Sequence, residues 1–263
     1  MDGLVDIHCH LLPGVDDGAR DLDAALAMAR MSVEEGVDTV VVTPHQCGAF
    51  EFNRGDDIRR RTAELQGELD ARSVPLRVLP GADVRIDDGL IQGLESGDIV
   101  SLGDHRRHVL LELPHELYLP LEPVLDGLER IGVVGVLSHP ERNAGVLAKP
   151  QLLRPLVDRG CLMQVTAGSF VGGFGDDSQR LAERMAREGL IHFVSTDGHG
   201  PKQRRPRLGH ALRAVAKLVG EDAAQRWCSE NPRAVADGRE VTPGVSPVRA
   251  PRRGWSLFGR GAA

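Results

Sequence analysis

Residues 4–10 read L-V-D-I-H-C-H, and a loop with P-G-V-D-D-G at residues 13–18 follows directly. The apolar start predicts a first β-strand that ends at two histidines. Side chains alternate across a strand, so we expect His8 and His10 on one face and Ile7 and Cys9 on the other. Two neutral imidazoles held this close are natural ligands for a divalent transition metal. The segment therefore predicts a metal site at the end of the first strand.

Length and composition predict one α/β domain of the ordinary globular type. The chain has 263 residues, of which 41% are hydrophobic and 27% are charged, enough to bury a full core. No apolar run approaches the ~20 residues of a membrane span, and the N-terminus carries acid where a signal peptide carries base. We therefore expect a cytoplasmic protein.

The cysteines predict no disulfide framework and no cysteine chemistry. They are scattered, without a C-x-x-C pair, and none has an arginine six residues downstream, so the phosphate-binding C-x5-R loop is absent. A G-x-S-x-G elbow for a serine nucleophile is also absent. The four cysteines are Cys9, Cys47, Cys161 and Cys228. Any hydrolytic chemistry is therefore expected from histidine and carboxylate, with Cys9 as a small packing residue between two ligands.

Charge divides the chain into a body at 1–241 and a tail at 242–263. The whole chain carries -6, and the tail holds four arginines and no acid, so the body carries -10. An acidic body argues against a nucleic-acid-binding face. The tail also contains Trp255, Leu257 and Phe258, which leaves two interpretations: an unstructured extension, or a weak peripheral anchor on anionic lipid. Its arginines are Arg249, Arg252, Arg253 and Arg260.

Strand and helix patterns alternate along the body. After the first strand we expect strands at 39–42, 76–79, 109–111, 133–137, 162–165 and 191–194. We expect helices at 22–35, 56–72, 121–130, 151–159, 179–188, 208–219 and 221–229. Such an alternation predicts a parallel sheet, either closed as a barrel or open and doubly wound.

Histidine or carboxylate ends six of the seven predicted strands. In an α/β barrel, groups at the carboxyl ends of different strands converge on one mouth. An open sheet gathers ligands at a single crevice and would leave several of these residues outside the site. We therefore favour the barrel.

Seven motifs occur in order: D-I-H-C-H-L-L-P-G-V-D-D-G, T-P-H, P-G-A-D-V-R-I, E-L-P, L-S-H-P-E-R, Q-V-T-A-G-S-F and S-T-D-G-H. They resemble the successive motifs of the PHP (polymerase and histidinol phosphatase) superfamily. Within it they resemble the bacterial capsule and exopolysaccharide type of metal-dependent protein-tyrosine phosphatase, from the first residues to about residue 232. The resemblance implies a distorted seven-stranded (β/α) barrel with a metal site at its C-terminal mouth.

The resemblance also implies three divalent ions, with manganese as the first candidate and iron or zinc as alternatives. The implied metal ligands are His8, His10, Asp17, His45, Asp83, Glu112, His139, Asp197 and His199. Imidazoles suit these metals, and carboxylates can bridge two ions. Ions about 3.5 to 4 Å apart can share a nucleophilic hydroxide and clamp phosphoryl oxygens. The family usually has glutamate where this chain has Asp83, so a shorter side chain stands at a bridging position.

Arginine binds phosphate through a planar fork that reaches two oxygens at once. Arg142 matches the arginine of the family's S-H-P-E-R loop and is the first candidate for the substrate phosphate, with Asp197 and His199 as further catalytic residues. Arg204 or Arg205 is the second candidate, and spacing does not separate them. The glycine-rich stretch 168–175 follows a strand without opening a P-loop sequence, so we interpret it as a flexible rim loop.

The leading functional hypothesis is a phosphomonoesterase that hydrolyses phosphotyrosine on a protein by metal-activated hydroxide. The expected partner is a tyrosine kinase that controls polysaccharide assembly. One alternative is a small-molecule phosphatase of histidinol-phosphate type, whose family has longer insertions. Another is a non-catalytic PHP regulatory module, which the nearly complete ligand set and the free-standing length argue against.

Overall fold

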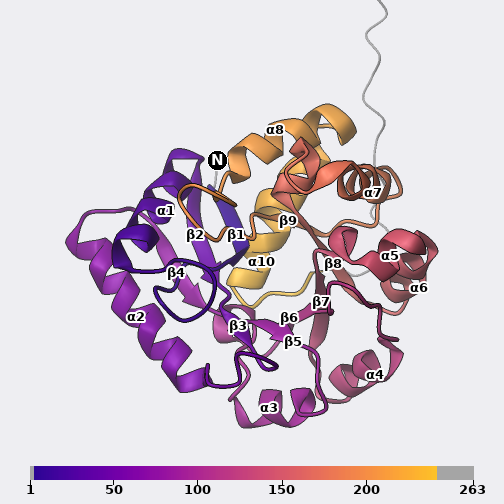
Figure 1. Ribbon diagram of the computed structural model, residues 1–263, viewed down its shortest axis with the longest axis horizontal. Helices are drawn as coiled ribbons and strands as arrows, with labels where there is room; N and C mark the ends of the chain where they lie inside the picture. The colour runs from indigo at the N-terminus through magenta and orange to yellow at the C-terminus, as the bar shows by residue number, and fades with distance from the viewer. Residues whose placement is uncertain (1–2, 242–263) are drawn as a thin grey trace, which may run out of the picture.

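The computed structural model describes residues 3–241. The predicted tail at 242–263, with the two hypotheses for it, lies outside the described residues. Strands occupy the middle of the molecule and helices surround them (Figure 1). Within the described part of the chain, no helix is both long enough and apolar enough to span a bilayer.

Nine strands lie within residues 3–241, and every pairing between them is parallel. One sheet has the order β1-β2-β4, and the other has the order β3-β5-β6-β7-β8-β9. The strands are β1 (Leu4–Cys9), β2 (Val37–Val42), β3 (His45–Gln46), β4 (Arg77–Pro80), β5 (Asp83–Arg85), β6 (His108–Glu112), β7 (Val134–Ser138), β8 (Leu162–Thr166) and β9 (Phe193–Ser195).

The helices follow the predicted alternation, with three additions. They are α1 (Leu22–Glu34), α2 (Gly55–Ala71), α3 (Leu90–Ser96), α4 (Glu122–Arg130), α5 (Ala144–Ala148), α6 (Leu153–Asp158), α7 (Gly175–Arg187), α8 (Leu208–Val219), α9 (Glu221–Gln225) and α10 (Asn231–Ala236). A π-helical turn, Arg226–Glu230, joins the last two. The sequence missed α3, α5 and α10. Helix α10 begins at Asn231, close to residue 229, where the last predicted helix was expected to end. Pro232 is compatible with this start because it lies in the first turn of the helix, where a missing N–H costs little.

The seven-stranded barrel is not confirmed. Two of the predicted strands continue as second, separate strands: β2 breaks at Thr43-Pro44 before β3, and β4 breaks at Gly81-Ala82 before β5. Pro44 has no N–H to donate to a ladder, which explains the first break. The edges of the two sheets nevertheless meet beyond β9, where Asp197 N donates to His8 O at 2.7 Å and His10 N donates to Gly198 O at 2.9 Å.

Strand β1 does not alternate regularly. Asp6 pairs with Val40 and Cys9 with Val42, so three steps on β1 match two on β2, and the strand is irregular between them. Ile7 packs in an inner apolar cluster and Cys9 in an outer one, so the prediction that they share a face is wrong.

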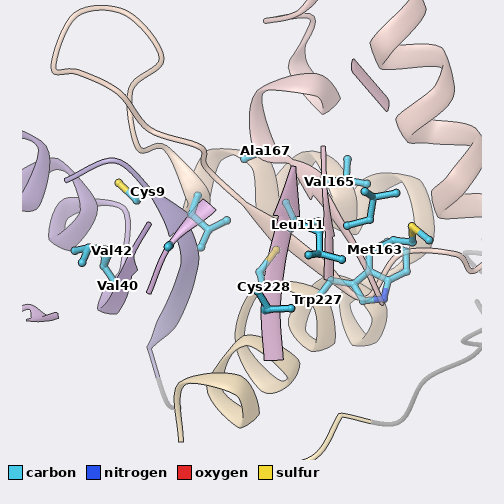
Figure 2. Close-up of a cluster of buried hydrophobic side chains, with 14 of the residues drawn as sticks. Cys9, Val40, Val42, Leu111, Met163, Val165, Ala167, Trp227 and Cys228 are labelled. Atoms are coloured by element: carbon cyan, nitrogen blue, oxygen red, sulfur yellow. The ribbon is translucent and has the colours of Figure 1, made fainter. Parts of the chain in front are cut away.

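Two apolar clusters pack the strands against one another and against the helices. The outer cluster fills the space between strands and helices, and Figure 2 shows part of it, including Leu111, Met163 and Trp227. The inner cluster takes side chains from β1, β2, β6, β7, β8 and β9 and is joined by Ala234, Val235 and Ala236 of α10. Burial of both clusters fixes the strand ends that carry the polar residues described next.

Candidate metal centre

His8, His10 and Asp197 form the middle of a buried polar cluster. The two imidazole Nε2 atoms lie 3.3 Å apart, and Asp197 Oδ1 lies 3.3 Å from each of them. The irregularity in β1 and the link to the loop after β9 bring these three side chains together.

All nine predicted ligands belong to groups whose donor atoms lie within 4.8 Å of one another. The groups are His10 with Asp17, His45 and His199; His8 with His10 and Asp197; His8 with Asp83 and His139; and His45 with Asp83 and Glu112. They come from loops or strand ends at β1, β3, β5, β6, β7 and β9. The structure thus brings together residues up to 191 positions apart in the sequence, from His8 to His199. Their role as ligands stays a prediction.

The nitrogen atoms of His8 and His10 are arranged to bind a cation rather than to hydrogen-bond each other. His8 Nδ1 lies 2.8 Å from Gln164 Oε1, and His10 Nδ1 lies 2.7 Å from Asp16 Oδ2. Because a carboxylate or amide oxygen accepts, each Nδ1 donates, and in the neutral imidazole each Nε2 then carries a lone pair. Two lone pairs that face each other at 3.3 Å repel unless a proton or a metal ion lies between them. Oxygen partners on the far nitrogen are also typical of metal-bound histidine.

Asp83 gives the same indication. It is fully buried, and neither of its oxygens has a hydrogen-bond partner among the described residues. Its Oδ2 lies 3.5 Å from His8 Nε2, 3.6 Å from His45 Nδ1 and 3.9 Å from His139 Nε2. A buried carboxylate without hydrogen bonds is costly unless a cation compensates it. Asp83 therefore lies where a bridging ligand would be needed, although its side chain is shorter than glutamate.

The electrostatics of the cluster favour added positive charge. Burial opposes protonation of His10, but hydrogen bonds to Asp16 and Asp197 outweigh it and raise the pKa to about 10. Burial and the nearby charge of Asp83 together raise the pKa of Glu112 to about 7. Burial also lowers the pKa of His139 to about 4. A proton or a metal ion can supply the missing positive charge, and the ligands that bind metal must first lose their protons.

Two arginines contact the other oxygen of Asp197. Arg142 and Arg204 both donate to Asp197 Oδ2, while Oδ1 faces the imidazoles. Burial opposes ionisation of Asp197, yet the surrounding imidazoles and arginines hold its pKa well below the usual value. Arg205 is exposed, so of the two arginines that spacing left open, Arg204 is the one that reaches the cluster.

A family model described as capsular polysaccharide synthesis, CpsB/CapC, matches residues 4–237. The chain belongs to the CpsB/CapC family. The family predicted from the motifs is therefore confirmed, and the match extends a few residues beyond the predicted limit at residue 232.

Relatives in the CpsB/CapC family are tyrosine-protein phosphatases by name. YwqE of Bacillus subtilis is 35% identical over 221 residues, which cover 83% of this chain and 86% of YwqE. CpsB of Streptococcus agalactiae is 25% identical over 239 residues, which cover 88% of this chain and 98% of CpsB. A crystal structure from work on YwqE of Bacillus subtilis and CpsB of Streptococcus pneumoniae, described as metal-dependent tyrosine phosphatases, superposes with a TM-score of 0.86 at 32% identity. It covers 92% of this chain and 99% of that one.

More distant structures share only the fold with this CpsB/CapC chain. The phosphotriesterase homology protein of Escherichia coli superposes with a TM-score of 0.58 at 11% identity, covering 88% of this chain and 97% of that one.

Four residues that support the CpsB/CapC site were missed from the sequence. Asp16 binds His10 Nδ1 and also accepts from His45 N at 3.0 Å, so one carboxylate orients two predicted ligands. Gln164 binds His8. Asp6 accepts from Thr196 N at 3.0 Å and from the Thr196 hydroxyl, and so holds the turn that presents Asp197. Glu141 supports the turn that carries Arg142, as described below.

Each missed residue stands inside a motif that the sequence did reveal: Asp6 in D-I-H-C-H, Asp16 in D-D-G, Glu141 in H-P-E-R and Gln164 in Q-V-T. Position inside a motif was the only available signal. Which member of a motif ligates and which one orients a ligand depends on side-chain direction, and the sequence alone does not give that.

Proposed function

We propose that the chain is a metal-dependent phosphatase that hydrolyses phosphotyrosine on a protein. The observation that carries this proposal is the position of Asp197, with one oxygen facing His8 and His10 and the other receiving Arg142 and Arg204. A cation-binding cluster and a phosphate-binding pair of arginines thus share one carboxylate. The names of the family's relatives support phosphotyrosine as the substrate.

We propose three divalent ions, manganese first and iron or zinc as alternatives. The four donor groups share His8, His10, His45 and Asp83, each of which occurs in two groups. For His8 and His10, Nδ1 is already hydrogen-bonded, which leaves one nitrogen for one metal. The groups therefore compete, and fewer than four ions can be held at once. Carboxylates such as Asp83 can bridge, which supports more than one ion.

When bound, the ions would supply Lewis-acid activation of water and neutralise charge on the phosphoryl group. The chain's own residues do the rest. Arg142 and Arg204 bind phosphoryl oxygens with donors that now contact Asp197, and the contact with Asp197 holds both side chains in orientation before substrate arrives. Asp17, with a side chain 58% exposed and close to His45 and His199, forms the open edge of the cluster.

No cysteine attack is needed in this mechanism. Cys9 packs in the outer apolar cluster, and burial raises the pKa of its thiol well above the usual value. A protonated thiol in that position is a poor nucleophile.

We further propose that the two sheets act as one distorted barrel, closed by the contact between β1 and the loop after β9, with the site at its C-terminal mouth. The parallel bridge between Cys9 and Gly198 supports this closure. A tyrosine kinase of polysaccharide assembly is proposed as the partner from the family description and the relatives' names. A cytoplasmic location remains a prediction from the sequence.

A substrate comparison tests the function. The full chain is loaded separately with manganese, iron or zinc and assayed on a phosphotyrosyl peptide, histidinol phosphate and a nucleotide. We expect the highest kcat/KM on the peptide. A higher kcat/KM on histidinol phosphate would assign the site to small-molecule phosphate esters, and no turnover with any metal would favour a regulatory module.

A further inference from the structure

The glycine-rich loop at 168–175 lies against the two arginines. Phe174 places its ring under the Arg142 guanidinium, with the ring centroid 4.2 Å from Cζ, and the Arg204 Cζ lies 5.9 Å from the same centroid. One aromatic ring therefore lies close to both of the cations that bind Asp197. From the sequence, this stretch is predicted only to be a flexible rim loop.

The glycines explain how Phe174 reaches this position. Gly173 N donates to Gly168 O at 2.9 Å and Gly175 N donates to Gly172 O at 3.3 Å, so these two amides are used inside the loop. Gly172 and Gly175 have φ of 77° and 84°, which favour glycine. A Cβ on Gly168 would lie 2.8 Å from the Phe174 ring. The glycines thus fold the loop back and leave room for the ring.

Glu141 connects this loop to the turn that carries Arg142. Its buried Oε1 accepts from Thr166 N at 3.0 Å and from Ser169 Oγ at 2.8 Å, just before and within the loop. Because Glu141 directly precedes Arg142, the guanidinium and the aromatic ring are supported by one connected unit. Movement of the loop relative to the arginine is therefore restricted.

We propose that Phe174 is a positioning residue that holds Arg142, and more weakly Arg204, in the orientation that binds the substrate phosphate. The proposal rests on the phosphatase function proposed above and adds a residue to it. A ring face attracts a guanidinium placed over it, most strongly where solvent is limited, and the Arg142 side chain is only 11% exposed. The ring keeps the plane of the fork fixed while its donors pass from Asp197 to phosphoryl oxygens.

The first test compares Phe174→Leu with Phe174→Tyr in metal-loaded full-length protein. Calorimetry measures inorganic phosphate binding, and steady-state kinetics measure KM and kcat on a phosphotyrosyl peptide. We expect the leucine variant to weaken phosphate binding and raise KM together, by about three- to tenfold, with kcat within about twofold. The tyrosine variant should restore both values, because it keeps the aromatic face.

Val171→Ala is the matched control, since Val171 is an exposed hydrophobic side chain on the same loop. Metal content and the thermal midpoint should match the unmodified protein in all three variants. Binding of inorganic phosphate can be measured even if the phosphotyrosyl peptide is not a substrate. Failure of this proposal is therefore distinguishable from failure of the proposed function.

The second test is a double-mutant cycle with Gly168→Ala. The added methyl group displaces the Phe174 ring, so the single variant should weaken phosphate binding about as much as Phe174→Leu does. In the Phe174→Leu background the same change should have little further effect, because the ring is already gone. Additive losses in the cycle, unchanged phosphate binding in Phe174→Leu, or no recovery in Phe174→Tyr would each overturn the proposal.

Discussion

The amino-terminal and carboxyl-terminal halves of the strands differ in character although they share one inward face. On three neighbouring strands, a fully buried aliphatic residue is followed two positions later by a buried polar one. These pairs are Leu110 with Glu112, Val136 with Ser138, and Leu162 with Gln164. Two residues along a strand return to the same face, so each pair stacks an apolar layer under a polar layer.

The apolar layer is complete in itself, whereas the polar layer is not. Helix α10 adds Ala234–Ala236 to the apolar end, which stabilises the fold by excluding water. At the polar end, Asp83 has no hydrogen-bond partner within residues 3–241, and the Nε2 atoms of His8 and His10 lie 3.3 Å apart. The apolar end therefore contributes stability, whereas the buried polar groups at the other end are costly unless cations compensate them.

The largest effect is expected from Asp197→Asn. The amide lacks the charge that Asp197 presents to the imidazoles and to the arginines, while asparagine tolerates the positive φ of 51° at this position. We expect kcat/KM on a phosphotyrosyl peptide to fall by about 10²- to 10³-fold or more, with loss of metal. Steady-state kinetics and metal analysis measure both. Activity within tenfold of that of the unmodified protein, with full metal content, would show that Asp197 is not essential to the site.

Arg142→Ala separates phosphate binding from metal binding. We expect it to retain metal and to lose roughly 10² in kcat/KM, because a phosphate ester loses a planar fork of donors. Arg142→Lys should recover little, since an ammonium does not reproduce the fork. Arg205→Ala serves as the matched control, because Arg205 is exposed, and should retain most activity. A metal-poor Arg142→Ala protein would show that Arg142 supports the metals instead.

Leu110→Ala and Glu112→Gln compare the two layers directly, two residues apart on β6. The alanine variant should lower the free energy of unfolding by about 2 to 5 kcal/mol and retain metal. The glutamine variant should weaken metal binding and leave the metal-free stability unchanged or higher, because burial and Asp83 already disfavour the Glu112 charge and raise its pKa. Denaturant unfolding of the metal-free proteins, together with metal titration, gives both quantities. If both variants changed the free energy of unfolding and metal binding in the same way, the two layers would not differ as described.

The smallest effect is expected from Cys9→Ser. Cys9 faces the outer cluster, so the change should cost ~1 kcal/mol of stability through a buried hydroxyl and leave kcat near that of the unmodified protein. Thermal unfolding and peptide hydrolysis measure the two effects. Loss of activity in a folded, metal-loaded variant would indicate a thiol nucleophile.

Much of the site could be predicted because parallel strands end at one edge. Glu112 ends β6, His139 directly follows β7, and His8 and His45 lie close to the ends of β1 and β2. Position at a strand's carboxyl end was enough to expect these residues at one mouth. Membership of the CpsB/CapC family followed from the order of the motifs.

The remaining features depend on geometry that periodicity does not carry. The irregularity between Asp6 and Cys9 moved Ile7 away from the face of Cys9, and the breaks at Pro44 and Gly81 divided two predicted strands. Phe174 lies under Arg142 only because a chain of glycines turns back on itself, and that fold cannot be read from spacing. Packing and backbone direction decided these features.

Metal analysis combined with activity tests the central claim most directly. The full chain is assayed on a phosphotyrosyl peptide before chelation, after exhaustive chelation, and after manganese, iron or zinc is returned. We predict more than one ion per chain at the start, abolished hydrolysis once the ions are removed, and restored hydrolysis with at least one of the three metals. Full activity in protein shown to be free of metal would contradict the account.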